Sequence, residues 1–269
     1  MIGNNFIFIE CPKTATTSIR QWFLDHHLAD PEINNLFQRH YDYLSICECL
    51  GSYPEFTFSV VRNPYSRFVS EYFYLKQLAE SPDLIGTGNS VRKRTKEDYL
   101  LMNPGYLHIL RQNSKKNSSL EESLHTLAAR EFFSSKPLFS DFAKNLLNSG
   151  IQFPYGHLKE TLQSNFIISE LRREEFSSYG KEYPKWWRNP KLGALLRFET
   201  LESDFYKLCE SRGWPKHPLQ KINSSYNKRL AWQEYYDNQS INAVNIFFKK
   251  DFINFNYPMV NTKQELYNL

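Results

Sequence analysis

Lys13 stands at the head of a short stretch of small, hydroxyl-bearing residues that has the make-up of an anion-binding loop. Before it, Phe6–Ile9 is a continuous apolar run, typical of a strand buried on both faces of a parallel sheet. After it, Ile19, Trp22 and Phe23 recur at helical spacing and predict an amphipathic helix. The first turn of such a helix carries N–H donors and partial positive charge, which suits a phosphate group. The side chains that add hydroxyl donors are Thr14, Thr16, Thr17 and Ser18.

A second strand-to-helix turn with a cationic residue follows some fifty positions later. The run 56–61 predicts another buried strand. Asn63 can cap a helix and Pro64 fits its first position, so a helix should begin here. Arg62 lies at the strand end, and Ser70 lies inside the helix eight residues on. The turn brings both within reach of one phosphate, which arginine binds through a planar fork of donors.

Both turns carry the residue order of a known enzyme family. The heptad Pro12-Lys13-Thr14-Ala15-Thr16-Thr17-Ser18 resembles the 5′-phosphosulfate loop of sulfotransferases, whose donor is 3′-phosphoadenosine-5′-phosphosulfate (PAPS). Arg62 with Ser70 resembles the motif by which these enzymes bind the 3′-phosphate of PAPS and of its product, PAP. The loop differs from the Gly-x-x-x-x-Gly-Lys-Ser/Thr loop of nucleoside-triphosphate enzymes, because its lysine comes first. The resemblance implies these donor-binding residues: Lys13, Thr14, Ala15, Thr16, Thr17, Ser18, Arg62 and Ser70.

The expected fold is α/β, a three-layer α/β/α arrangement with a central parallel sheet, which is the P-loop-NTPase-like fold of sulfotransferases. We expect a single domain over residues 1–269, since no linker or repeat divides the chain. A helix is predicted after Pro137, with Phe139 and Phe142 facing inward. The passage 194–201 predicts a late strand that leads into a helix over 202–212. This late passage is closest to carbohydrate O-sulfotransferases of the heparan and chondroitin type.

Within this resemblance, Lys13 is the expected catalytic cation, which neutralises charge on the leaving phosphate oxygen. His40 is the expected base for the acceptor hydroxyl, because its segment resembles the histidine-containing stretch of uronosyl 2-O-sulfotransferases. Those enzymes have a His-x-His pair, whereas only His40 is present here. Glu71 is the alternative base, although a place on the helix surface is the simpler expectation for it. Arg67 is expected to pair with a carboxylate or to support the 3′-phosphate site. No metal is expected.

The composition of the chain limits the kinds of molecule that it is expected to bind. A formal net charge of +4 fits an anionic substrate but is too small for a nucleic-acid-binding protein. No apolar run is long enough to span a membrane, so a cytoplasmic protein is expected. The predicted acceptor is a saccharide hydroxyl, with a protein tyrosine or a small metabolite left open, as is the oligomeric state. The other classes are a nucleoside-triphosphate enzyme and a non-catalytic nucleotide- or glycan-binding module.

Overall fold

A computed structural model of the chain describes residues 1–3, 5–29, 42–43, 46–47, 55–80, 129, 132–147, 158, 162–168, 192–222 and 230–269. The strands are β1 (Ile2–Gly3), β2 (Phe6–Ile9), β3 (Thr57–Val61) and β4 (Ala194–Arg197). The helices are α1 (Thr16–Asp25), α4 (Pro64–Glu80), α8 (Phe139–Lys144), α10 (Gln163–Ile167), α12 (Leu201–Arg212), α13 (Asn238–Phe247), α14 (Lys249–Asn254) and α15 (Lys263–Leu266). Short 3₁₀ turns lie at Asn145–Leu147, Phe198–Thr200 and Trp232–Tyr235.

The sheet has the strand order β1-β2-β3-β4. β2, β3 and β4 are parallel to one another, and β1 pairs antiparallel with β2. Ile9 lies opposite Ser59, and Val61 lies opposite Arg197, so the three parallel strands end at the same edge. The expected α/β class with a parallel sheet flanked by helices is confirmed. This edge is where the residues after each strand come together.

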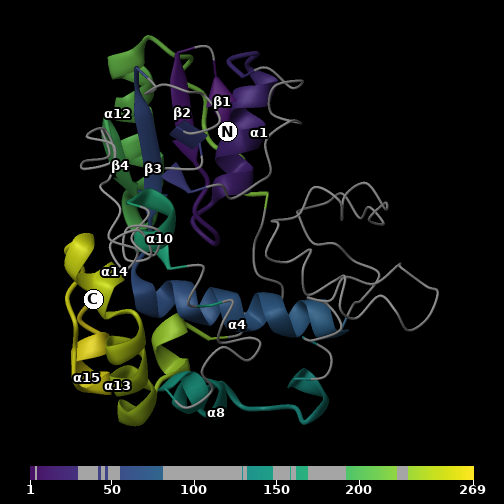
Figure 1. The fold of residues 1–269 in the computed structure, drawn as a ribbon, viewed down its shortest axis with the longest axis vertical. Helices are drawn as coiled ribbons and strands as arrows, with labels where there is room; N and C mark the ends of the chain where they lie inside the picture. The colour runs from purple at the N-terminus through teal and green to yellow at the C-terminus, as the bar shows by residue number, and fades with distance from the viewer. Residues whose placement is uncertain are drawn as a thin grey trace, which may run out of the picture.

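Alternate residues of β2 pack against different helices on the two faces of the sheet. Phe6 and Phe8 pack with α1 and α12 in one hydrophobic cluster, whereas Ile7 and Ile9 pack with α4, α8, α13 and α14 in the other. Figure 1 shows α1 beside β1 and β2, and α4 running across below the strands. All four side chains are buried because a parallel sheet covered on both faces has no solvent side. The apolar run in the sequence therefore has its physical cause in this double cover.

The local signals at the start of α4 are confirmed. Asn63 Oδ1 accepts a hydrogen bond from the Tyr65 N–H at 3.0 Å, and Pro64 occupies the first helical position. The predicted helix after Pro137 is α8, with Phe139 and Phe142 buried.

β4 is shorter than predicted, because it ends at Arg197 rather than continuing to 201. Asp204 is the physical reason. Its Oδ2 accepts hydrogen bonds from the Arg197 N–H at 3.3 Å and from the Thr200 hydroxyl at 2.6 Å. These bonds turn the chain into α12, whose other end is closed by Gly213 in the left-handed conformation (φ 66°).

In the part of the chain that the structure describes, no helix has the length and apolar character needed to cross a membrane. The single domain over residues 1–269 and the cytoplasmic location stay predictions.

Candidate active site

The loop between β2 and α1 makes two left-handed turns. Lys13 has φ 66° and Ala15, at the N-cap of α1, has φ 63° and ψ 23°. This conformation is costly for a residue with a side chain, and it curls the loop tightly over the end of β2. The first hydrogen bond of the helix runs from the Ile19 N–H to the Ala15 carbonyl at 3.2 Å. An α-helix cannot satisfy the N–H groups of its own first turn, so the donor-rich end of α1 lies beside Lys13.

The hydroxyls of the loop differ in what they contact. Thr14 is fully buried, and its hydroxyl donates to the Cys11 carbonyl at 2.8 Å, so it braces the loop from inside. Ser18 accepts a hydrogen bond from the Ile222 N–H at 3.5 Å. That the hydroxyls of this loop donate to an anion stays a prediction.

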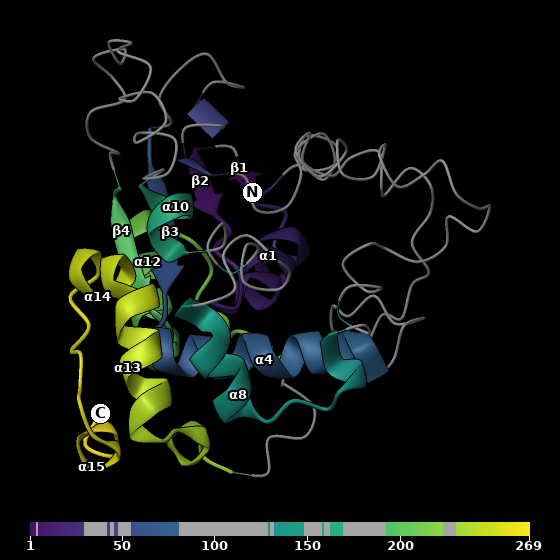
Figure 2. The same ribbon diagram turned by 60° about the horizontal axis from the view of Figure 1, so that its bottom comes forward.

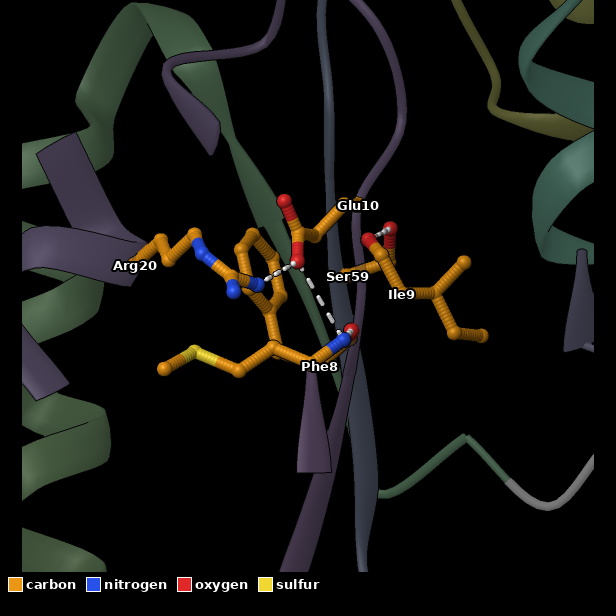
Figure 3. A network of polar contacts seen from close by, with 6 residues as sticks. Phe8, Ile9, Glu10, Arg20 and Ser59 are labelled. Carbon is orange, nitrogen blue, oxygen red and sulfur yellow. Dashed lines mark hydrogen bonds and ion pairs between the residues drawn. The ribbon is translucent and has the colours of Figure 1, made fainter. Parts of the chain in front are cut away.

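An ion pair ties the two ends of the loop together. Arg20 Nη1 of α1 lies 2.8 Å from Glu10 Oε1, directly after β2, as Figure 3 shows. The amino group of Met1 lies 3.3 Å from the same Glu10 oxygen. In the neighbouring strand, the Ser59 hydroxyl donates to the Ile9 carbonyl at 2.9 Å. These contacts fix the end of β2 from which the loop departs.

Arg62 lies directly against the Lys13 loop. Its Nη1 donates to the Lys13 carbonyl at 3.1 Å, and its Nε donates to the Ser66 hydroxyl at 2.9 Å. Its guanidinium carbon lies 4.1 Å from the ring centroid of Phe198, at the end of β4. Within the described residues, no group accepts a hydrogen bond from Nη2. The two cations that the sequence analysis placed in separate turns therefore lie at one edge of the sheet.

Ser70 is buried one turn beyond Ser66 on α4. Residues four apart share a helix face, so Ser70 follows Ser66 on the side that faces Arg62. The hydroxyl that contacts the Arg62 side chain is, however, that of Ser66. The sequence analysis missed Ser66, although its spacing of four from Arg62 was a usable signal.

Side chains on one face of α4 contact the loop between β2 and α1. Arg67 Nε donates to the Pro12 carbonyl at 3.2 Å, and Lys13 Nζ lies 4.1 Å from the ring centroid of Tyr74. Positions 67, 71 and 74 share one helix face, which places Glu71 between these two contacts. Glu71 is 2% exposed. The expectation of a surface carboxylate at Glu71 is therefore wrong.

The charges of this cluster act on one another. Burial lowers the pKa of Lys13 to about 8; Glu71 raises it, whereas Arg62 and Arg67 lower it further. Burial also lowers the pKa of Arg62 to about 10, opposed by the nearby Glu199 carboxylate. Both groups are therefore mainly protonated at neutral pH. Three cations gathered around a strand-to-helix turn make a donor set that fits a phosphorylated ligand.

Glu199 is a further residue that the sequence analysis missed. It follows β4, and its carboxylate accepts from the Asn63 N–H at 2.7 Å and from the Tyr257 hydroxyl at 2.9 Å. Burial and the Glu199 charge raise the pKa of Tyr257. Glu199 thus joins the end of β4 to the start of α4. It lay inside the predicted strand 194–201, so the sequence pattern gave no signal for this role.

His40, the predicted base, lies outside the described residues. Among the residues that are described, no three or more His, Cys, Asp or Glu side chains are grouped so that they could hold a metal ion.

The chain is thus an α/β protein in which Lys13 and Arg62 lie together at the carboxyl edge of a parallel sheet. Comparison with known families finds that the profile described as "Sulfotransferase family" matches residues 3–160, more than half of the chain. The chain belongs to the sulfotransferase family. No match was found among curated proteins or among solved structures.

Proposed function

We propose that the protein is a PAPS-dependent O-sulfotransferase that acts on a saccharide hydroxyl. The observation that carries this proposal is the hydrogen bond from Arg62 Nη1 to the Lys13 carbonyl at 3.1 Å. It joins the turn that resembles the 5′-phosphosulfate loop to the turn that resembles the 3′-phosphate motif. A nucleotide with phosphates at both ends would then meet a cation at each end.

The chain's own residues divide the work. The backbone donors of Lys13, Thr14, Ala15, Thr16, Thr17 and Ser18 hold the 5′-phosphate. Arg62 and Ser70 hold the 3′-phosphate, with Ser66 and Phe198 fixing the plane of the guanidinium. PAPS, when bound, supplies the sulfuryl group and leaves as PAP. Lys13 holds its positive charge where the leaving oxygen becomes negative, so it acts by preorganised electrostatics.

His40 is the proposed base. In the reaction, the acceptor oxygen bonds to sulfur as the bond from sulfur to the 5′-phosphate oxygen breaks, and the hydroxyl proton passes to the imidazole. A histidine near its ordinary pKa of about 6.5 can accept this proton at neutral pH. Glu71 remains the alternative base, and its burial near Lys13 also suits it to balance the three cations.

The competing functions are a sulfotransferase for protein tyrosine or a small metabolite, and a non-catalytic nucleotide- or glycan-binding module. The acceptor class is tested by incubating the protein with ³⁵S-labelled PAPS and a panel of saccharides, tyrosine peptides and small alcohols. Labelled saccharide is the expected product. Tight PAP binding without transfer to any acceptor would instead support the binding module.

The variant His40→Ala separates catalysis from binding. We expect it to lower turnover by about 10²- to 10⁴-fold, the usual contribution of a general base. PAP affinity should stay within about twofold of the wild type, because the base contacts the acceptor side of the site. Unchanged turnover would remove His40 from the mechanism and leave Glu71→Gln as the next variant to test.

A further inference from the structure

The backbone of Arg62 is held by a side chain 101 residues away. Gln163, at the start of α10, donates from Nε2 to the Arg62 carbonyl at 2.9 Å. Its Oε1 accepts from the Arg62 N–H at 2.7 Å. The amide therefore pairs with both backbone groups of Arg62, as a neighbouring strand would, one residue beyond the end of β3. Gln163 is fully buried, so water does not compete for these bonds.

Gln163 is itself held by a buried carboxylate from the C-terminal part of the chain. Asp251 of α14 is 0% exposed and accepts from the Gln163 N–H at 2.9 Å. Asp251 also accepts from the Ser164 N–H at 2.8 Å and from the Ser164 hydroxyl at 2.6 Å. Leu162, the N-cap of α10, offers no capping side chain, so Asp251 takes that role from outside the helix. Figures 1 and 2 both show α10 beside the end of β3 and near α14.

This arrangement makes a continuous polar connection from α14 to the predicted phosphate-binding arginine. Each link is buried, and each is a hydrogen bond of 2.9 Å or less between Asp251, Gln163 and Arg62. A guanidinium binds phosphate with the right plane only if the backbone that carries it is fixed. The side-chain contacts of Arg62 with Ser66 and Phe198 set that plane, and Gln163 sets the backbone beneath it.

We propose that Gln163, supported by Asp251, is a positioning residue that sets the affinity of the site for a nucleotide 3′-phosphate. This inference rests on the proposed function, because it takes Arg62 as the ligand of that phosphate. Both residues lie beyond the match to the family at residues 3–160, so the family resemblance does not assign them. Gln163 acts through Arg62. The preference of the site for a nucleotide with a 3′-phosphate would then depend on α10, which begins 101 residues further along the chain.

A purely structural role for Gln163 makes a different prediction. Loss of fold stability would weaken the binding of every nucleotide alike. A positioning role would weaken only the nucleotide that carries a 3′-phosphate. PAP and AMP differ by this one group, so the ratio of their affinities reports on the 3′-phosphate subsite alone.

The test is calorimetric titration of PAP and of AMP into the full-length wild type and its variants Arg62→Ala, Gln163→Met and Asp251→Asn. Gln163→Met keeps the length of the side chain and removes both hydrogen bonds. Asn245→Ala is the matched control, since Asn245 Nδ2 donates to the Val260 carbonyl at 2.7 Å and its Oδ1 accepts from the Tyr65 hydroxyl, with no bond to Arg62. Thermal melts identify any variant that does not fold.

The wild type should prefer PAP over AMP, and Arg62→Ala should remove most of this preference. We expect Gln163→Met to lower the ratio of PAP to AMP affinity about five- to tenfold. A change of this size corresponds to the net contribution of about one hydrogen bond. Asp251→Asn should lower the ratio less, and Asn245→Ala should leave it unchanged. AMP affinity should stay constant throughout.

Three outcomes overturn the inference, and they are distinguishable. If the wild type shows no preference for PAP, or if Arg62→Ala keeps it, the proposed function is refuted and the positioning role with it. If the wild type and Arg62→Ala behave as expected but folded Gln163→Met keeps the full preference, only the positioning role is refuted. An equal loss of PAP and AMP affinity in both Gln163→Met and Asp251→Asn also refutes it.

Discussion

Replacing Lys13 by methionine should stabilise the fold while it abolishes turnover. The protein holds the Lys13 cation in a buried loop, where its pKa falls from an ordinary 10.5 to about 8. A difference of about 2.5 pH units, at about 1.4 kcal/mol each, corresponds to a cost of about 3.5 kcal/mol at neutral pH. The lost contact between the ammonium and the Tyr74 ring offsets about 0.5–1 kcal/mol. We therefore expect Lys13→Met to gain about 2.5 kcal/mol in free energy of unfolding.

The stability gained by Lys13→Met should depend on pH. Between about pH 8 and pH 10.5 the unfolded chain binds more protons at Lys13 than the folded chain does, so wild-type stability at this site rises with pH. The advantage of Lys13→Met is complete below about pH 8 and shrinks as the pH approaches 10.5. Urea unfolding of both proteins at pH 7 and pH 9.5 measures it.

The control is Lys207→Met on the exposed side of α12, which should change the free energy of unfolding by less than about 0.5 kcal/mol. A Lys13→Met protein that is less stable than the wild type at pH 7 would refute the reasoning. A gain that is the same at both pH values would refute it as well.

Two further predictions follow from the loop and its charges. Ala15→Gly should raise the free energy of unfolding by up to about 1 kcal/mol, because glycine adopts φ 63° without strain; urea unfolding measures the change, and a loss would contradict it. Since Lys13 must be protonated to stabilise the leaving group, kcat/KM should fall as the pH rises through about 8, the pKa of Lys13 in the free protein. A rate that stays flat to pH 10 in the assay with labelled PAPS would argue against Lys13 as the catalytic cation.

The parts of the fold that the sequence predicted depend on local signals. β2 and β3 are apolar runs because both of their faces are covered, and Asn63 with Pro64 starts α4 through contacts within three residues. β4 ended earlier than predicted because of Asp204, whose carboxylate captures the Arg197 N–H from seven residues away. The apolar pattern of a strand could not reveal that the Arg197 N–H would bond the Asp204 side chain at the start of α12, where β4 ends.

In the site, too, residues with a local sequence signal were predicted, and residues that depend on distant contacts were not. Lys13 and Arg62 stood out because each is a cation in a short turn between a predicted buried strand and a predicted helix. Gln163 did not stand out, because its partner Arg62 lies 101 residues away and a glutamine in a short helix carries no pattern. The burial of Glu71 was missed for a related reason: the helix is covered on more sides than its apolar spacing indicates. Tertiary packing decided each of these, and a single sequence does not encode it locally.

In the proposed function, Lys13 and Arg62 bind opposite ends of one nucleotide. A crystal structure of the protein with PAP tests it most directly. We expect the 5′-phosphate at the first turn of α1 beside Lys13 and the 3′-phosphate on the Arg62 guanidinium. A nucleotide bound elsewhere, or one that touches only one of these two side chains, would contradict it.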